Sequence, residues 1–253
     1  MQEFWIFALV GFCAQIVDGA LGMGFGVISS SVLLAQGIPP ALASASVNAA
    51  KLPTTGTAAL SHLLHRNLDW DLLRSLAIFG SLGGIVGALL LTSLKGQALG
   101  VIVSAYLLLM GALIVWRGLR DYTPRLISPA RRRLIGLAGG LIEGIGGSWG
   151  PIVTTSLLGS GAVSRFAIGS GNFAEFIVSA AVFGAFVSAF ALGHWEGGGD
   201  WRATFLPVLG LVLGGIPAAV FGGWLSKRAP RRILTVAVGC LALGIGIYRL
   251  FLA

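Results

Sequence analysis

The sequence predicts an all-α integral membrane protein built from two inverted-topology repeats, each a glycine-broken helical hairpin followed by three transmembrane helices, about eight helices in all. Composition and an internal repeat support this class. Only 10% of the 253 residues are charged and 56% are hydrophobic, whereas soluble domains have about 25% charged and 45–50% apolar residues. The 39 glycines suit membrane helices that pack closely. A single membrane domain over residues 1–253 is therefore expected.

The two halves of the chain align over nearly their whole length. Residues 11–22 match residues 136–147, which places Asp18 on Glu143. The further equivalent pairs are Ser46 and Ser170, Asn48 and Asn172, Lys51 and Glu175, and Asp69-Trp70 and Asp200-Trp201. We expect repeat 1 over residues 1–120 and repeat 2 over residues 131–253, joined by a cytoplasmic linker over residues 121–130.

Each half begins with an apolar stretch that glycines interrupt, at residues 4–36 and 134–160. Three apolar segments of spanning length follow in each half, at residues 41–64, 72–93 and 98–117, and at 164–192, 202–225 and 233–251. The interrupted stretch could be one long broken span or a hairpin of two shorter helices.

The distribution of basic residues favours the hairpin. Arginine and lysine gather in the connections at residues 117–133 and 227–232, and such loops stay cytoplasmic. This pattern follows the membrane topology and gives no basic stripe for nucleic acid. Both connections can be cytoplasmic only if the interrupted element enters and leaves on one side. The halves are then inverted, and both termini lie outside.

The glycine breaks at residues 19–26 and 144–151 occupy matching positions in the two halves, which is the best sequence indication of a transporter's binding site. Unwound backbone at membrane depth is tolerated only where it lines a cavity or is buried in protein. Helices that begin near Val27 and Ile152 would present N–H groups to an anion. The alternative is that the glycines only allow tight helix crossing. The break residues that we expect at the substrate are Gly24, Gly26, Ser148 and Gly150.

Four ionisable residues lie in apolar surroundings, where charge is costly and a functional role is the default. Lys51 and Glu175 are candidates for substrate binding and coupling, with a structural ion pair or a helix-end position as alternatives. Asp18 and Glu143 precede the breaks and could either take up protons or hold the loops by accepting hydrogen bonds from backbone N–H groups.

Polar residues accompany these charges. Asn48 lies at i, i+3 spacing from Lys51 and therefore shares its helix face. Asn172 and Ser170 occupy the equivalent positions in the second half. Amides and hydroxyls suit an oxyanion, although in membranes they also join helices structurally.

No metal or cofactor site is expected. His62 and His65 with Asp69 lie at the end of a span beside arginine, where a water-exposed loop explains them better than a metal site does. The same holds for His194 and Glu196 in the second half. The glycine breaks lack the Gly-Lys-Ser/Thr sequence of a nucleotide loop, so an ATP-driven pump is not indicated.

Residues 11–37, with Asp18 and the 22–26 break ahead of an Ala-rich segment that ends in Ser-Val-Asn48, resemble the sulfite exporter TauE/SafE family. Residues 136–175 resemble the same pattern. The resemblance implies a multi-pass permease of the inner (plasma) membrane for sulfite, a sulfonate or a related organosulfur anion, without a cofactor. One departure is that the first break lacks a proline equivalent to Pro151 and the second carries Trp149, so the pocket shape is expected to be particular to this chain.

The expected function is secondary transport of a small anion at the interface of the repeats, with Asp18, Glu143 or Glu175 available to couple protons. A passive anion channel is the alternative. An enzyme is not expected, because the histidines lie at loop edges. The expected partners are the anion and the lipid bilayer, a homodimer is left open, and no nucleic acid is expected.

Overall fold

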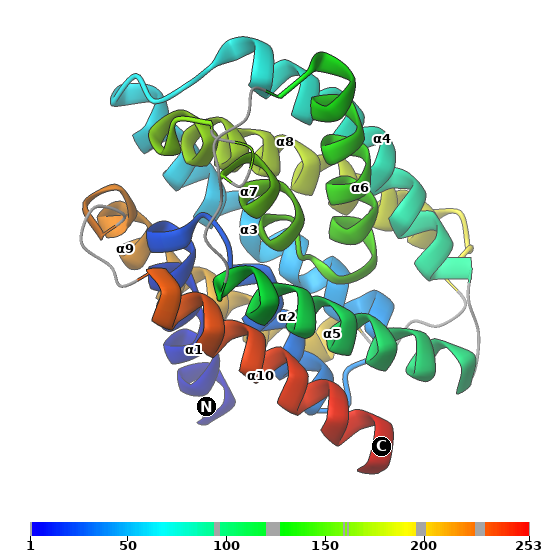
Figure 1. Cartoon of the computed structure of the whole chain (residues 1–253). Coiled ribbons are helices and arrows are strands. Elements are labelled where there is room, and N and C mark those ends of the chain that lie inside the picture. Colours follow the sequence, from blue (N-terminus) through cyan, green and yellow to red (C-terminus); the bar gives the residue numbers. More distant parts are fainter. Residues whose placement is uncertain are drawn as a thin grey trace.

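The computed structural model describes residues 2–93, 97–119, 127–158, 160, 162–195, 201–225 and 231–252, and helix is the one regular structure in these ranges (Figure 1). The elements are α1 (Gln2–Leu21), α2 (Phe25–Ala35), α3 (Pro40–Leu64), α4 (Trp70–Ser93), α5 (Gln97–Gly118), α6 (Pro129–Gly146), α7 (Gly150–Leu158), α8 (Ser164–Ala191), the short 3-10 helix η1 (Trp201–Thr204), α9 (Phe205–Leu225) and α10 (Arg231–Leu252). The predicted all-α class is confirmed. The described ranges hold ten α-helices, because each predicted hairpin contributes two.

The interrupted stretches are hairpins. Gly22 and Gly24 separate α1 from α2 with φ values of 67° and 136°, and Gly147 follows α6 with a φ of 67°. Glycine adopts these angles without the steric penalty that a side chain would add. In Figure 1, α1 runs from the end that bears both termini to mid-height and α2 returns, whereas α6 and α7 do the same from the opposite end. At 11 and 9 residues, α2 and α7 are too short to cross a bilayer core of about 30 Å.

The helices pack in pairs. Helix α1 packs along α9, and their counterparts α6 and α4 pack in the same way, while α3 packs on α8 and α5 on α10. The crossings depend on glycine. A Cβ added at Gly140 would overlap the carbonyl oxygen of Gly80, and one added at Gly214 would overlap the carbonyl oxygen of Ala8. Close approach of this kind is how small residues stabilise helix pairs in lipid.

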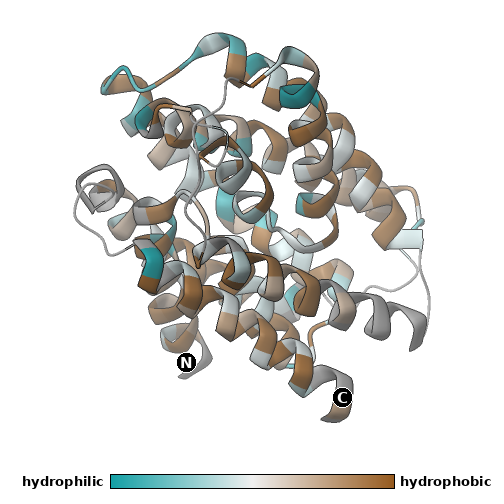
Figure 2. Cartoon of the chain, in the orientation of Figure 1, coloured by the Kyte–Doolittle hydropathy of each residue, from teal (hydrophilic) through white to brown (hydrophobic). Residues whose placement is uncertain are grey.

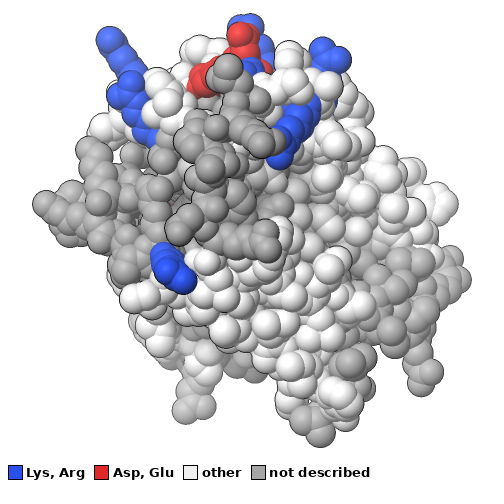
Figure 3. Space-filling view, in the orientation of Figure 1, with Lys and Arg blue, Asp and Glu red and all other residues white. Residues whose placement is uncertain are grey.

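The outer surface suits a bilayer. Large apolar side chains such as Trp5, Leu82 and Phe190 are more than half exposed, and hydrophobic residues cover the length of the helices (Figure 2). Figure 3 shows charged side chains gathered mainly at one end of the visible face, over the α3–α4 connection and the start of α6. Two described helices, Trp70–Ser93 and Arg165–Ala191, are long and apolar enough to cross a membrane by length and composition.

The first helix of the predicted repeat 2 begins slightly before the predicted boundary at residue 131. Helix α6 begins at Pro129, inside the predicted linker, because Ser128 caps it by accepting a hydrogen bond from the N–H of Arg131 at 3.4 Å and proline suits the first turn. Positions 121–126 of the predicted linker lie outside the described residues.

Candidate functional site

The two glycine breaks meet in the middle of the molecule and hold each other. Thr154 of α7 donates a hydrogen bond to the carbonyl oxygen of Gly22 at 2.6 Å, and Ser30 of α2 donates one to the carbonyl oxygen of Gly146 at 2.6 Å. The second helix of each hairpin therefore donates a hydrogen bond to a carbonyl oxygen at the break of the other hairpin. Gly26 lies so close to the opposite break that an added Cβ would overlap the carbonyl oxygen of Gly147.

Lys51 lies at this crossing and is fully buried. Its ammonium group donates three hydrogen bonds, to Glu143 Oε1 at 2.8 Å, to Glu175 Oε1 at 2.8 Å and to the carbonyl oxygen of Gly147 at 2.7 Å. Helices α3, α6 and α8 thus converge on one cation, and two of the contacts are ion pairs. An ammonium group has three hydrogens to donate, so all of the donors of Lys51 are in use.

Asp18 and Glu143 accept hydrogen bonds from backbone N–H groups at the two breaks, which is one of the two roles that the sequence suggested for them. The N–H of Phe25 at the start of α2 donates to Asp18 Oδ1 at 3.3 Å. The N–H of Trp149, just before α7, donates to Glu143 Oε2 at 2.7 Å, and Ser179 donates to Glu143 Oε1 at 3.1 Å. Both carboxyls therefore occupy the positive ends of helices that would attract an anion.

The two equivalent asparagines are buried, and neither is fully hydrogen-bonded. Asn48 donates to the carbonyl oxygen of Ser44 on its own helix at 2.9 Å, and the amide nitrogen of Asn172 lies 3.5 Å from His62 Nε2. Among the described residues, the side-chain oxygens of both asparagines have no hydrogen-bond partner. Buried unsatisfied acceptors are uncommon, and these two lie one helical turn from Lys51 and from Glu175, respectively.

Of the remaining candidates, Ser148 and Gly150 lie at the crossing and Ser170 does not. Ser148 and Gly150 lie in the second break, where Ser148 donates to the carbonyl oxygen of Gly146 at 3.2 Å and Gly150 abuts Met23. Ser170 lies elsewhere, because its hydroxyl joins the α3–α4 connection by accepting from the N–H of Asp69 at 2.8 Å.

The expectation of a water-exposed loop is wrong for His62. The residue belongs to the last turn of α3 and is only 8% exposed, because its ring faces Asn67 and Asn172, whereas His65 at the helix end is exposed. Within the described residues, no group of three or more His, Cys, Asp or Glu side chains could hold a metal ion.

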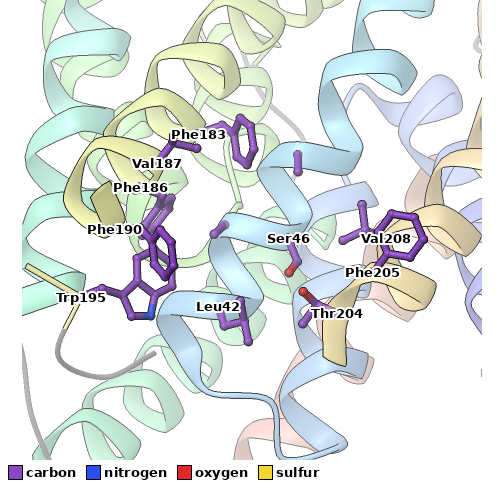
Figure 4. A pocket seen from close by; sticks show the side chains of 12 residues that line it. Leu42, Ser46, Phe183, Phe186, Val187, Phe190, Trp195, Thr204, Phe205 and Val208 are labelled. Carbon is purple, nitrogen blue, oxygen red and sulfur yellow. The ribbon is translucent and has the colours of Figure 1, made fainter. Parts of the chain in front are cut away.

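An apolar cavity of about 370 Å³, which the sequence did not indicate, lies between α3, α8 and the start of α9 (Figure 4). Phenylalanines of α8, Trp195 and Phe205 line it, with Ser46 and Thr204 as the polar members. Ser46 and Leu42 lie on the opposite face of α3 from Lys51, so the cavity is separate from the ion-pair cluster. The closely spaced phenylalanines at positions 183, 186 and 190 were the available sequence signal.

Comparison with known proteins decides the family. The family model described as sulfite exporter TauE/SafE matches residues 7–249. The chain belongs to the TauE/SafE family. It is also 36% identical over 247 residues to the probable membrane transporter protein YtnM of Bacillus subtilis (strain 168), an alignment that covers 94% of this chain and 80% of that protein. No solved structure matches the chain.

Membership of the TauE/SafE family makes this chain a membrane transporter and points away from an enzyme. The residues on which the resemblance rested lie around Lys51. Gly147 of the second break accepts a hydrogen bond from it, a Cβ added at Gly26 of the first break would lie 2.8 Å from its Nζ, and Asp18 holds the start of α2. The buried cluster of Asp18, Lys51, Glu143 and Glu175 is thus the candidate site of this family member.

Proposed function

We propose that the protein is a secondary transporter of the plasma membrane for a small anion such as sulfite, a sulfonate or a related organosulfur anion, with its binding site where the two hairpins cross. The observation that supports this most directly is the Lys51 ammonium group, buried between the two breaks. A charge at membrane depth is expensive and is retained where it serves a substrate or ion pathway.

The chemistry around Lys51 suits an oxyanion. The N-terminal ends of α2 and α7 place positive dipole ends at the crossing, where Asp18 and Glu143 accept hydrogen bonds from the first N–H groups. Asn48 and Asn172 add amide groups nearby, and an amide can turn either its nitrogen or its oxygen toward a ligand. The matching family is described as sulfite exporters, which makes a sulfur oxyanion the first substrate to test.

The closed crossing favours a carrier over a channel. The break at Gly26 packs directly against the carbonyl group of Gly147, and the hydroxyls of Ser30 and Thr154 lock the two hairpins together. An anion can pass only if the hairpins move relative to each other, as in alternating access. A passive channel, the alternative, would conduct without saturating.

The membrane potential sets what each direction of transport would require. Each elementary charge is worth about 2.3 kcal/mol per 100 mV of membrane potential. An anion that leaves a cell with a negative interior is driven outward by the potential, so export needs no coupling ion. Uptake of the same anion would need one.

The test is uptake of radiolabelled sulfite into proteoliposomes, with an organosulfonate, thiosulfate and sulfate as competitors. We expect saturable flux in the wild type, loss of flux in Lys51→Ala, and wild-type flux in Arg74→Ala, which removes an exposed cation from the first turn of α4. Gel filtration establishes that each variant is folded. Absence of flux with all of these anions in folded wild-type protein would remove the substrate class, and flux that rises linearly with concentration would favour the channel.

A further inference from the structure

Lys51 and the first N–H groups at the two breaks have no hydrogen left to donate to a substrate. All three hydrogens of the Lys51 ammonium group are donated to protein oxygens. The helix-start N–H groups of Phe25 and Trp149 are donated to Asp18 and Glu143. An anion that binds to Lys51 must therefore displace one of the protein's own acceptors.

The two carboxyls on Lys51 are held very differently. Glu143 accepts three hydrogen bonds: one from Lys51, one from the N–H of Trp149 and one from the hydroxyl of Ser179. Glu175 accepts one, from Lys51, and its other oxygen has no partner among the described residues although it is buried. Glu175 is therefore the acceptor that an anion can displace with the least disruption.

The charges at the crossing do not balance when all groups are ionised. Three buried carboxyls, those of Asp18 of α1, Glu143 of α6 and Glu175 of α8, interact electrostatically with one buried cation among the described residues, Lys51 of α3. Helices α2 and α7 carry no titratable residue. A buried carboxylate that loses its cation is left with a large desolvation penalty. It relieves that penalty by binding a proton.

We propose that Glu175 couples transport to protons: the substrate anion takes the place of the Glu175 carboxylate on Lys51, and Glu175 takes up one proton from solvent. This inference rests on the proposed function and adds its coupling ion. For a monovalent anion the step is electroneutral, because one negative charge and one proton enter the site together. Asp18 and Glu143 keep their places at the starts of α2 and α7.

The experiment uses methanesulfonate, a monovalent anion whose charge does not change near neutral pH. Proteoliposomes are clamped at zero membrane potential with potassium and valinomycin, and two activities are measured: exchange of labelled for unlabelled methanesulfonate, and accumulation driven by a pH gradient. We expect wild-type protein to accumulate the anion about tenfold for each pH unit, because proton and anion gradients coupled one to one must balance.

Glu175→Gln keeps an oxygen that can accept from Lys51 but cannot bind a proton. We expect this variant to exchange methanesulfonate and to accumulate none under the pH gradient. Asp71→Asn makes the same chemical change at an exposed carboxyl in the first turn of α4 and should behave as wild type. If Glu175→Gln does not fold, a pH-sensitive dye in weakly buffered wild-type proteoliposomes measures the number of protons transported with each anion. We expect one proton per anion.

The outcomes separate the two proposals. Exchange without pH-driven accumulation in the wild type would overturn proton coupling and leave the anion carrier standing. Accumulation that persists in Glu175→Gln would overturn the assignment to Glu175. If methanesulfonate, sulfite and thiosulfate all fail to exchange, the substrate class fails, and the coupling proposal fails with it.

Discussion

Gly26→Ala tests whether the crossing of the two breaks is as close as the structure has it. The added Cβ would overlap the carbonyl oxygen of Gly147 and lie 2.6 Å from its carbonyl carbon and 2.8 Å from Lys51 Nζ, where 3.4–4 Å is ordinary contact. Neither group can retreat freely, because the ammonium group is held by three hydrogen bonds and the carbonyl belongs to the opposite backbone. Overpacking costs about 1–3 kcal/mol, and we expect the upper end of that range here.

For a chain of this size, about 3 kcal/mol corresponds to a fall in Tm of roughly 6–12 °C, which a fluorescence-detected thermal unfolding assay in detergent resolves. Gly184→Ala is the matched control, because no atom lies within 4 Å of its added Cβ. Alanine favours a helix over glycine by about 1 kcal/mol, so the Tm of Gly184→Ala should equal or exceed that of the wild type. Equal Tm values for Gly26→Ala and the wild type would refute the close approach of the two breaks.

Three further predictions follow from the same structure. Replacement of Lys51 by methionine leaves two buried carboxyls without their cation, so the free energy of unfolding should fall by about 3–5 kcal/mol. The decrease in Tm relative to the wild type, measured by thermal unfolding, should be smaller in acid, where the carboxyls bind protons. His65→Cys in the α3–α4 connection and His194→Cys beyond α8 should react with an impermeant thiol reagent from opposite sides of the membrane; reaction from one side would contradict the inverted halves. Cys13 and Cys240 are exposed on apolar helices, where a thiol that faces lipid stays protonated. A charged thiol reagent should therefore label them only after unfolding in detergent; labelling in the folded protein would place them in water.

Much of this arrangement could be predicted from the sequence, because glycine and charge have strong local effects. Only glycine adopts the positive φ angles at Gly22, Gly24 and Gly147 readily, so the breaks could be located. The clustering of arginine in two connections predicted that each broken element returns to its own side, and in the structure each of these elements is a pair of helices, α1–α2 and α6–α7, that turns back at its glycine break.

The partners of Lys51 could not be predicted in full. The alignment of the two halves made Lys51 and Glu175 equivalent positions. The contact of Lys51 with Glu143 depends on how the two hairpins cross, and no spacing in the sequence indicates that crossing. Ser170 shows the same limit. Ser46 and Ser170 are equivalent positions of the two halves, yet Ser170 lies near the start of α8 beside Asp69, while Ser46 lines the apolar cavity.

His62 shows why helix ends are difficult to interpret. Its position beside Arg66 suggested a water-exposed loop, but a helix end exposes only the side that faces away from its neighbours. The ring of His62 points toward Asn172 on α8, whereas His65, at the end of the same helix, reaches water.

An anion that binds where the two breaks cross should protect a single cysteine placed there from chemical modification. Ser148→Cys is placed in the second break, in a background in which Cys13 and Cys240 are changed to serine. A small charged thiosulfonate reagent is applied to proteoliposomes with and without the anion that flux assays show to be transported. We predict that position 148 is labelled and that saturating anion slows the labelling; a labelling rate that the transported anion leaves unchanged would contradict a binding site at the crossing.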